Sequence, residues 1–439
     1  MVVLYCLFCF LAAYAGKNLY RNLFNPICLY SIVWGVAVFV HQSGLVYFYR
    51  LTPFCWMVIF ASHLLFILGC FIGWSLNVGE KPNEAESVCD VQLKKWMFIG
   101  IAVTMSLAAI AIIANLKAMI SIYGFNLMEQ IVLIYGDRIN ETEKIETIPY
   151  LGSFIFITLP LLGCYLKRFG FNLIVIPCVL LACADALISG ARGGIVFALL
   201  LFLAGYLCMD KEDESSANVF NGKGRVIFLV ICLVAFISMI FFVSNERADG
   251  LKMGFATDLY KDLFGYNVAL YKGLVYIAGP IGTLNEYLRE CEFHFGKNSF
   301  LTIYNVLARL GLMEPINHYQ EFFLTPIECN VGTWVREIIE DFTLVGAVFF
   351  VPLFGVLSSC VYSMALKRKT ITMKIVWSVF AMVLALSFYD WKFRSASIWI
   401  AVLFGVLIGK FIDRKSFEIA EDESEDELED ELDDELGDE

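Results

Sequence analysis

Residues 54–76 read FCWMVIFASHLLFILGCFIGWSL, an apolar run without one Asp, Glu, Lys or Arg side chain. A helix needs about 20 predominantly apolar residues to cross the hydrocarbon core of a bilayer, so this run predicts a transmembrane helix. The composition extends the prediction to the rest of the chain, because its 439 residues are 59% hydrophobic and its mean hydropathy is +0.70. Soluble domains are only about 45–50% apolar. The sequence therefore predicts an all-α, polytopic membrane protein.

Similar apolar runs alternate with short polar connections along the chain and predict about 11 transmembrane helices. The first run has no basic residue before it, so we expect a retained span and not a cleaved signal. The expected spans are 1–15, 26–44, 54–76, 96–116, 148–166, 171–189, 195–209, 226–244, 344–365, 371–391 and 397–412.

One connection is far longer than the others and divides the chain into regions. Residues 245–343 contain no run that could sit in a bilayer. A loop of this length is usually functional or a small domain of its own, and we expect it to be partly helical. The predicted regions are a membrane region with eight spans (1–244), the large loop (245–343), a membrane region with three spans (344–415) and an acidic low-complexity tail (416–439).

Lys and Arg residues are unevenly distributed between the two sides of the predicted membrane region. Seventeen fall in one set of alternate connections and seven in the short connections of the other set. Cytoplasmic loops are enriched in Lys and Arg, so the richer side is predicted to be cytoplasmic. With eleven spans, the N-terminus and the long loop are then periplasmic, and the C-terminus is cytoplasmic.

The net charge of −12 belongs to the C-terminal tail. Fifteen of the 44 acidic residues lie within 418–439, and the rest of the chain carries a formal charge of +3. Such charge density favours a disordered, self-repelling tail. Leu428, Leu432 and Leu436 recur every four residues, so a helical stripe that binds a partner is the alternative.

A tight turn, Ser189-Gly-Ala-Arg192-Gly-Gly, joins two predicted spans on the periplasmic side. An arginine at a membrane face is costly unless it lines a polar cavity or binds an anion, and its planar fork suits a phosphate. We therefore predict that Arg192 binds a pyrophosphate. An arginine that extends to the lipid headgroups is the alternative.

The long loop supplies further cations. Arg247 closely follows a predicted span and could reach the same cavity as Arg192. Arg309 and Arg336 lie in partly apolar, helix-like contexts, so we predict the same pyrophosphate-binding role for them. The alternative for each is a solvated surface charge.

A polar cluster in the loop could carry acid–base chemistry. In Trp334-Val-Arg-Glu-Ile-Ile-Glu-Asp-Phe, Glu337 and Asp341 are four residues apart and share a helical face, whereas Glu340 turns away from Asp341. We predict His318, Glu337 and Asp341 as catalytic candidates, because a carboxylate or an imidazole can act as general base on a sugar hydroxyl. Helix-end charges or ordinary hydrogen bonds are the alternative.

The sequence offers little for other ligands. No DxD, Walker A or GxGxxG pattern occurs, so nucleotide binding has no support, and we expect no metal and no cofactor. Most cysteines fall inside apolar runs, where cysteine behaves as a small hydrophobe. Cys291 and Cys329 lie in the long loop, and their spacing leaves a disulfide open.

The chain contains several short motifs: Asn25-Pro26 before the span that contains Trp34, Ser189-Gly-Ala-Arg192-Gly, Tyr276 to Tyr287, Gly296-Lys-Asn-Ser-Phe300 through Leu307-Ala-Arg309-Leu-Gly311, Asn330-Val-Gly-Thr333, and Glu340-Asp341-Phe342 with Gly346. In this order the motifs resemble the bacterial oligosaccharide repeat-unit polymerases, or O-antigen polymerases. Thr343 stands where members of that family often have glycine after Asp-Phe.

The resemblance implies an inner-membrane, glycosyltransferase-type enzyme of surface polysaccharide biosynthesis, such as O-antigen, lipopolysaccharide or capsule. Such an enzyme transfers a growing glycan from undecaprenyl pyrophosphate to a hydroxyl of the next lipid-linked repeat unit. Implied partners are the lipid-linked oligosaccharide, a chain-length regulator and a flippase, and no nucleic acid. Alternatives are an O-antigen ligase with a lipid A core acceptor, a phospholipid or peptidoglycan enzyme, or a polysaccharide or small-molecule transporter. A transporter would place ionisable residues at corresponding positions in two paired halves of the membrane region. Asp185 is the clearest acidic residue inside a predicted span, and no matching residue occurs in a second half.

Overall fold

The structure is a computed structural model, and its described residues form a helical bundle with a small two-stranded sheet. It describes residues 1–76, 78, 90–125, 133–134, 136–137, 148, 150–189, 192–209, 253–314, 316, 320–368 and 370–436.

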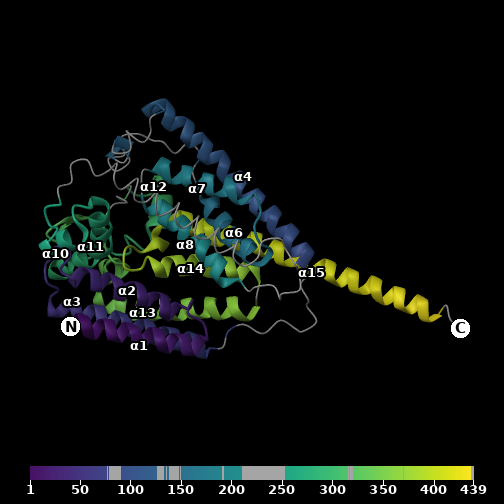
Figure 1. Ribbon diagram of the computed structural model, residues 1–439, viewed down its shortest axis with the longest axis horizontal. Coiled ribbons are helices and arrows are strands. Elements are labelled where there is room, and N and C mark those ends of the chain that lie inside the picture. Colours follow the sequence, from purple (N-terminus) through teal and green to yellow (C-terminus); the bar gives the residue numbers. More distant parts are fainter. Residues whose placement is uncertain are drawn as a thin grey trace.

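Eight described elements precede the long loop (Figure 1). They are α1 (Val2–Tyr20), α2 (Pro26–Gln42), α3 (Pro53–Ser75), α4 (Asp90–Tyr123), the 3-10 turn η1 (Leu151–Phe154), α6 (Ile155–Phe169), α7 (Val175–Ser189) and α8 (Arg192–Cys208). The remaining elements are α10 (Asp258–Phe264), α11 (Val268–Glu290), α12 (Leu301–Arg309), β1 (Phe323–Leu324), β2 (Glu328–Cys329), α13 (Trp334–Arg368), α14 (Ile371–Ala385), η2 (Lys392–Arg394) and α15 (Ala396–Leu436).

Ten of the predicted spans coincide with described helices, and the eleventh, 226–244, lies outside the described residues. Among the described residues, six stretches are long and apolar enough to cross a membrane: α1, α3, α4, η1 with α6, α13 and the first half of α15. The apolar helices α2, α7, α8 and α14 are shorter. A helix of 17 residues spans only about 25 Å, less than the roughly 30 Å of a hydrocarbon core. The structure thus supports a helical membrane protein, but not the count of eleven spans.

Helix starts follow local capping chemistry. Asn25 precedes Pro26, and its side chain accepts a hydrogen bond from the Cys28 backbone N–H. Thr52 before Pro53 does the same for the N–H of Cys55. Such caps satisfy a free N–H of the first turn, and proline is well tolerated at the first helical position.

Glycines allow close helix contacts at two places in the bundle. A side chain at Gly69 of α3 would collide with the Pro352 carbonyl of α13, and one at Gly355 would collide with the Phe66 carbonyl. A side chain at Gly205 of α8 would likewise collide with the backbone of α6. Small residues of this kind let helix backbones approach each other where lipid supplies no hydrophobic drive.

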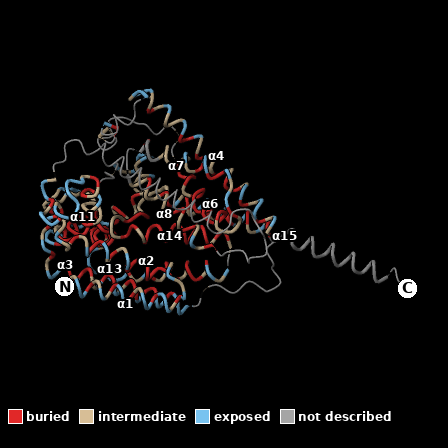
Figure 2. The backbone as a smooth tube through the Cα atoms, viewed as in Figure 1, coloured by how far each residue is buried: buried red, intermediate tan, exposed pale blue. Residues whose placement is uncertain are grey.

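Burial is arranged as a lipid-embedded bundle requires. Figure 2 shows buried residues concentrated in the central helices, whereas buried, intermediate and exposed residues alternate along α1 and α4. Large apolar side chains remain exposed on the outer helices, including Phe10 at 68% and Phe349 at 70%. Many exposed large apolar side chains on the outer helices are expected where helices contact lipid or another protein.

The two ends of the bundle differ. The elements of the long loop, α10 to α12 and the β1–β2 hairpin, gather at one end, and α15 leaves from the opposite end (Figure 1). At that opposite end Arg168 donates to Asp90 at 2.9 Å, and Lys367 donates to the Val78 carbonyl at 3.4 Å. In place of the disordered tail we expected, α15 continues through the acidic residues as far as Leu436.

A sharp change of direction divides α13 at Thr343. This residue has φ 62° and ψ 178°, whereas the segments on either side are helical. Only glycine adopts this backbone region without strain, and other residues bear about 1–3 kcal/mol of it. The kink separates a buried polar segment, 334–342, from the apolar segment that follows.

We expect Thr343→Gly to stabilise the protein by about 1 kcal/mol, because relief of strain exceeds the entropic cost of glycine. Its side chain is exposed, so little packing is lost. Thermal unfolding in detergent measures the change, and Thr343→Ala, which keeps a Cβ, is the control. A lower unfolding temperature for the glycine variant than for the alanine variant would contradict this account of the kink.

Candidate functional site

The polar segment 334–342 lies beneath the loop elements at one end of the bundle, and four of its charged side chains are buried. Arg336 is 1% exposed, Glu337 0%, Glu340 6% and Asp341 0%. Buried charges require partners or a ligand, so the contacts of each one show whether it is free to act.

Aromatic side chains form the base of this segment. Trp334 donates from its indole N–H to the Tyr30 hydroxyl at 3.1 Å and stacks on Trp391 with ring centroids 5.5 Å apart. Trp34 donates to the Ser387 hydroxyl at 2.9 Å. These bonds, each between residues far apart in sequence, fix the start of α13 against α2 and the α14–α15 connection.

Glu337 is held in an ionic cluster. It accepts from the Trp391 backbone N–H at 3.2 Å, from Arg394 Nη1 at 3.4 Å and from the Gln320 side chain. Lys392 pairs with Asp390, and Arg394 lies 3.9 Å from the same carboxylate. A buried ion pair with its hydrogen bonds made has a structural role, because loss of one partner leaves an uncompensated charge.

The pKa of the Asp390 carboxyl shows that its neighbours in this cluster favour the charged carboxylate. Burial alone would raise the pKa of this carboxyl, but Lys392 and Arg394 lower it to about 2. A folded-state pKa below the ordinary value means that the pairing stabilises the protein above pH about 4. That stabilisation is lost as the pH falls towards 2.

Asp341 caps the loop that follows α11. One of its oxygens accepts from the Asn298 backbone N–H at 2.8 Å, and the other accepts from that of Ser299 at 2.6 Å. The Asn298 side-chain amide adds a third bond at 3.2 Å. Its acceptor sites are therefore used to hold the loop.

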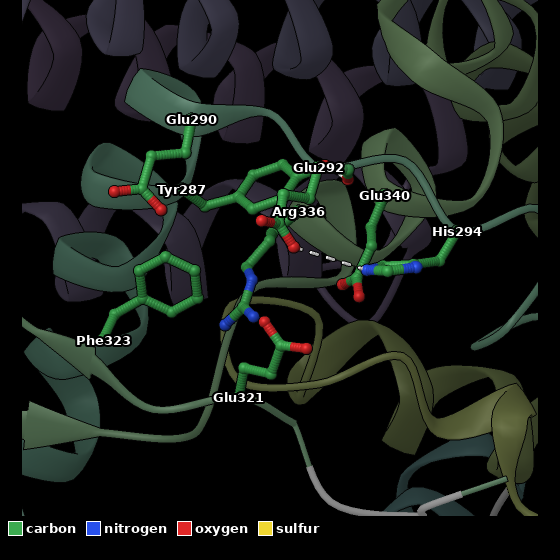
Figure 3. A pocket seen from close by; sticks show the side chains of 8 residues that line it. All are labelled: Tyr287, Glu290, Glu292, His294, Glu321, Phe323, Arg336 and Glu340. Atoms are coloured by element: carbon green, nitrogen blue, oxygen red, sulfur yellow. Dashed lines mark hydrogen bonds and ion pairs between the residues drawn. The ribbon is translucent and has the colours of Figure 1, made fainter.

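The remaining face of the segment opens into a pocket (Figure 3). The pocket lies between the end of α11, the chain after it, the β1–β2 hairpin and α13. Its lining residues are Tyr287, Glu290, Glu292, His294, Glu321, Phe323, Arg336 and Glu340.

Arg336 lies at the bottom of this pocket. Its guanidinium carbon is 4.5 Å from the Phe323 ring centroid and 5.5 Å from that of Tyr287, which are cation–π distances. Within the described part of the chain, its Nε and Nη1 have no hydrogen-bond partner. A buried guanidinium with free donors in a pocket is prepared for an anionic or polar ligand.

Glu340, one helical turn after Arg336, is the second free group. Its backbone carbonyl accepts from the His294 N–H at 2.8 Å, whereas its Oε2 has no hydrogen-bond partner among the described residues. In Figure 3 its carboxyl group faces the pocket beside the His294 ring. A buried carboxylate with a free oxygen is a candidate general base.

The pocket is rich in negative charge. The carboxylates of Glu290, Glu292, Glu321 and Glu340 outnumber the single guanidinium of Arg336. His294 Nε2 lies 3.7 Å from Glu292 Oε2. Ligand atoms of Glu292, His294 and Glu321 all lie within 4.8 Å of one another, a spacing that could hold a metal ion.

The structure places the predicted site residues in different surroundings. Arg336 lines the pocket, and Glu337 and Asp341 lie beside it but are engaged in the bonds described above. Arg309 is exposed on α12, with its guanidinium 5.0 Å from the Tyr150 ring, and it does not line the pocket. His318, Arg247 and the side chain of Arg192 lie outside the described residues.

Sequence reasoning missed most of the pocket. Glu292, His294 and Glu321 are brought together across about 30 residues of chain, and nothing in their spacing points to a shared site. Glu340 carried a signal, because it lies four residues after Arg336 and shares its helical face. Cys291 and Cys329 are both unpaired, so no disulfide joins the loop.

No protein-family model, curated protein or solved structure matches this chain.

Proposed function

We propose that this protein is a membrane glycosyltransferase that polymerises lipid-linked oligosaccharide repeat units. In this proposal the pocket around Arg336 and Glu340 is the reaction site, at the periplasmic face of the bacterial inner membrane. The observation that carries the proposal is the pairing of a buried guanidinium that has free donors with a buried carboxylate that has a free oxygen, on one turn of α13.

In this proposal Arg336 stabilises the negative charge of the leaving group. When the bond between the sugar and undecaprenyl pyrophosphate breaks, negative charge develops on the pyrophosphate. A fixed cation with two free N–H groups stabilises that charge more strongly in a buried site than in water. The rings of Tyr287 and Phe323 hold the guanidinium in place.

In this proposal Glu340 is the general base that takes the proton of the acceptor hydroxyl. A hydroxyl of the next repeat unit attacks the anomeric carbon and loses its proton to the free Glu340 oxygen, and the bond to the pyrophosphate breaks at the same step. The new glycosidic bond extends the glycan, and the lipid pyrophosphate leaves. The exposed aromatic residues of the loop can stack on sugar rings beside this site.

The proposal also includes the membrane topology and the further arginines that we predicted from the sequence. Eleven spans, a periplasmic N-terminus and a cytoplasmic C-terminus would place the pocket outside the cytoplasm, where flipped lipid-linked substrates are available. Arg192 and Arg247 would approach the pyrophosphate from separate connections. A chain-length regulator and a flippase would be partners in the membrane.

Deletion of the gene in its native host, with the surface glycan resolved on a gel, tests the function. Loss of a polymerase is expected to leave a core that carries a single repeat unit, and this result would support the proposal. A core without any repeat unit would indicate a ligase instead. Unchanged chain lengths would contradict both roles and leave a transporter or another lipid enzyme.

We expect Arg336→Ala in the complementing copy to reduce chain growth about 100- to 1,000-fold, the usual effect of removing one group that stabilises developing charge. Arg289→Ala is the matched control, because Arg289 is an exposed residue of α11 paired with Glu286. The glycan ladder, compared at equal membrane expression, measures the effect. Wild-type ladders from the Arg336 variant would remove this residue from the site.

A further inference from the structure

The pocket contains more acidic groups than a pyrophosphate site alone would need. Four carboxylates face one guanidinium, and a bound cation would offset this excess of negative charge. Three of the lining residues, Glu292, His294 and Glu321, offer ligand atoms within 4.8 Å of one another. The question is whether this group is a built cation site or an ordinary acidic surface.

We propose that Glu292, His294 and Glu321 bind a divalent transition-metal ion at the mouth of the pocket, with Glu340 beside it. This proposal goes beyond the proposed glycosyl transfer and does not depend on it, because the ion is bound by the protein's own side chains. It also departs from our sequence-based expectation that no metal is needed.

The ligand types select the class of ion. One imidazole nitrogen and two carboxylate oxygens form a mixed N/O ligand set. Such a set suits Mn²⁺ or Zn²⁺ better than it suits Ca²⁺, which prefers sites made of oxygen ligands alone. Three protein ligands leave coordination positions open for water or a substrate oxygen, as in catalytic metal sites.

The second observation is the buried carboxylate beside these ligands. Glu340 is 6% exposed, its Oε2 has no partner among the described residues, and it faces the same pocket (Figure 3). Its backbone carbonyl accepts the His294 N–H at 2.8 Å, so the same helix that presents Glu340 also positions the chain that carries the imidazole. A free buried oxygen next to a His–carboxylate group can support a cation bound by that group.

The arrangement also accounts for the mixture of charges. An ion held by Glu292, His294 and Glu321 would offset the acidic excess while Arg336, at the bottom of the pocket, keeps its two free donors. An anionic ligand could then contact the ion and the guanidinium together.

The test measures Mn²⁺ binding to the purified full-length protein in detergent, without any substrate. After removal of metals with a chelator, the free Mn²⁺ signal in electron paramagnetic resonance is followed as protein is added. We expect one bound ion per chain in the wild type. His294→Ala and Glu321→Gln are each expected to weaken binding at least 10-fold, as is usual when a metal site loses a supporting group.

Glu328→Gln is the matched control, because Glu328 is an exposed carboxylate on the β1–β2 hairpin that follows Glu321 but lies outside the pocket. His294→Gln provides a second variant with a polar side chain if the alanine variant does not fold, as checked by its thermal unfolding. No bound Mn²⁺ in the wild type, or equal binding by wild type and both site variants, would overturn the proposal. Glycan transfer could still occur in that case, so failure here is separate from failure of the proposed function.

Discussion

Glu340→Gln is expected to reduce glycan chain growth about 100- to 10,000-fold, the contribution usual for a positioned general base. The amide has nearly the shape of the carboxylate but cannot take up the proton of the attacking hydroxyl. The helix position and the hydrogen bond from the His294 backbone N–H to the Glu340 carbonyl are unaffected, so the fold should be retained. Product length per unit of purified protein measures the effect.

Glu290→Gln is the control for Glu340→Gln. Glu290 lines the same pocket but is exposed, so loss of its charge should change chain growth little. A second test compares Glu340 with Asp341, which was predicted as catalytic from the sequence. If Asp341→Asn stopped chain growth in a folded protein while Glu340→Gln did not, Asp341 would be the base and the free oxygen of Glu340 would have another role.

Arg394→Met is expected to destabilise the protein by about 3–5 kcal/mol, because it leaves the buried carboxyl groups of Glu337 and Asp390 without the guanidinium that contacts both. Arg394 Nη1 lies 3.4 Å from Glu337 and 3.9 Å from Asp390, and the Glu337 side chain is 0% exposed. Lys392 would still pair with Asp390. Unfolding in a denaturing detergent series measures the loss.

The double variant Glu337→Gln with Arg394→Met is the control for this prediction. Removing both partners of a buried pair costs far less than removing one, so the double variant should recover most of the lost stability. A double variant less stable than Arg394→Met would show that Glu337 is held by its other bonds, from Trp391 and Gln320, more than by the arginine.

The helices were predictable where the apolar pattern alone decides them. The run 54–76 differs from α3 by one residue at each end, and Pro53 explains the earlier start. The predicted span 371–391 was too long, since α14 ends at Ala385. After that point the Ser387 carbonyl accepts the Trp334 N–H at 3.0 Å, a contact between residues far apart in sequence that no local pattern contains.

The site was predictable only in part, for a similar reason. The four-residue spacing that pairs Glu337 with Asp341 also pairs Arg336 with Glu340, and both pairs lie on one helix. Which pair faces the pocket is decided by distant partners. Asn298 and Ser299 take up Asp341, and Arg394 takes up Glu337, so the pair with free polar atoms is Arg336 and Glu340.

Thr343 is an instructive intermediate case. Position 343 is a threonine, although the family that the chain resembles often has glycine there. The backbone at this position has the positive φ that favours glycine. A local sequence feature therefore marked the kink that separates the buried polar segment from the apolar one. It could not reveal what the polar segment contacts.

The most direct test is reconstitution of the purified protein with lipid-linked repeat units in liposomes, with product length read by mass spectrometry or gel. The wild type is expected to convert single repeat units into a series of longer lipid-linked glycans without a nucleotide sugar, and Glu340→Gln to leave them as single units. Substrate that remains monomeric with folded wild-type protein, or equal polymer from both proteins, would contradict the placement of glycan polymerisation in this pocket.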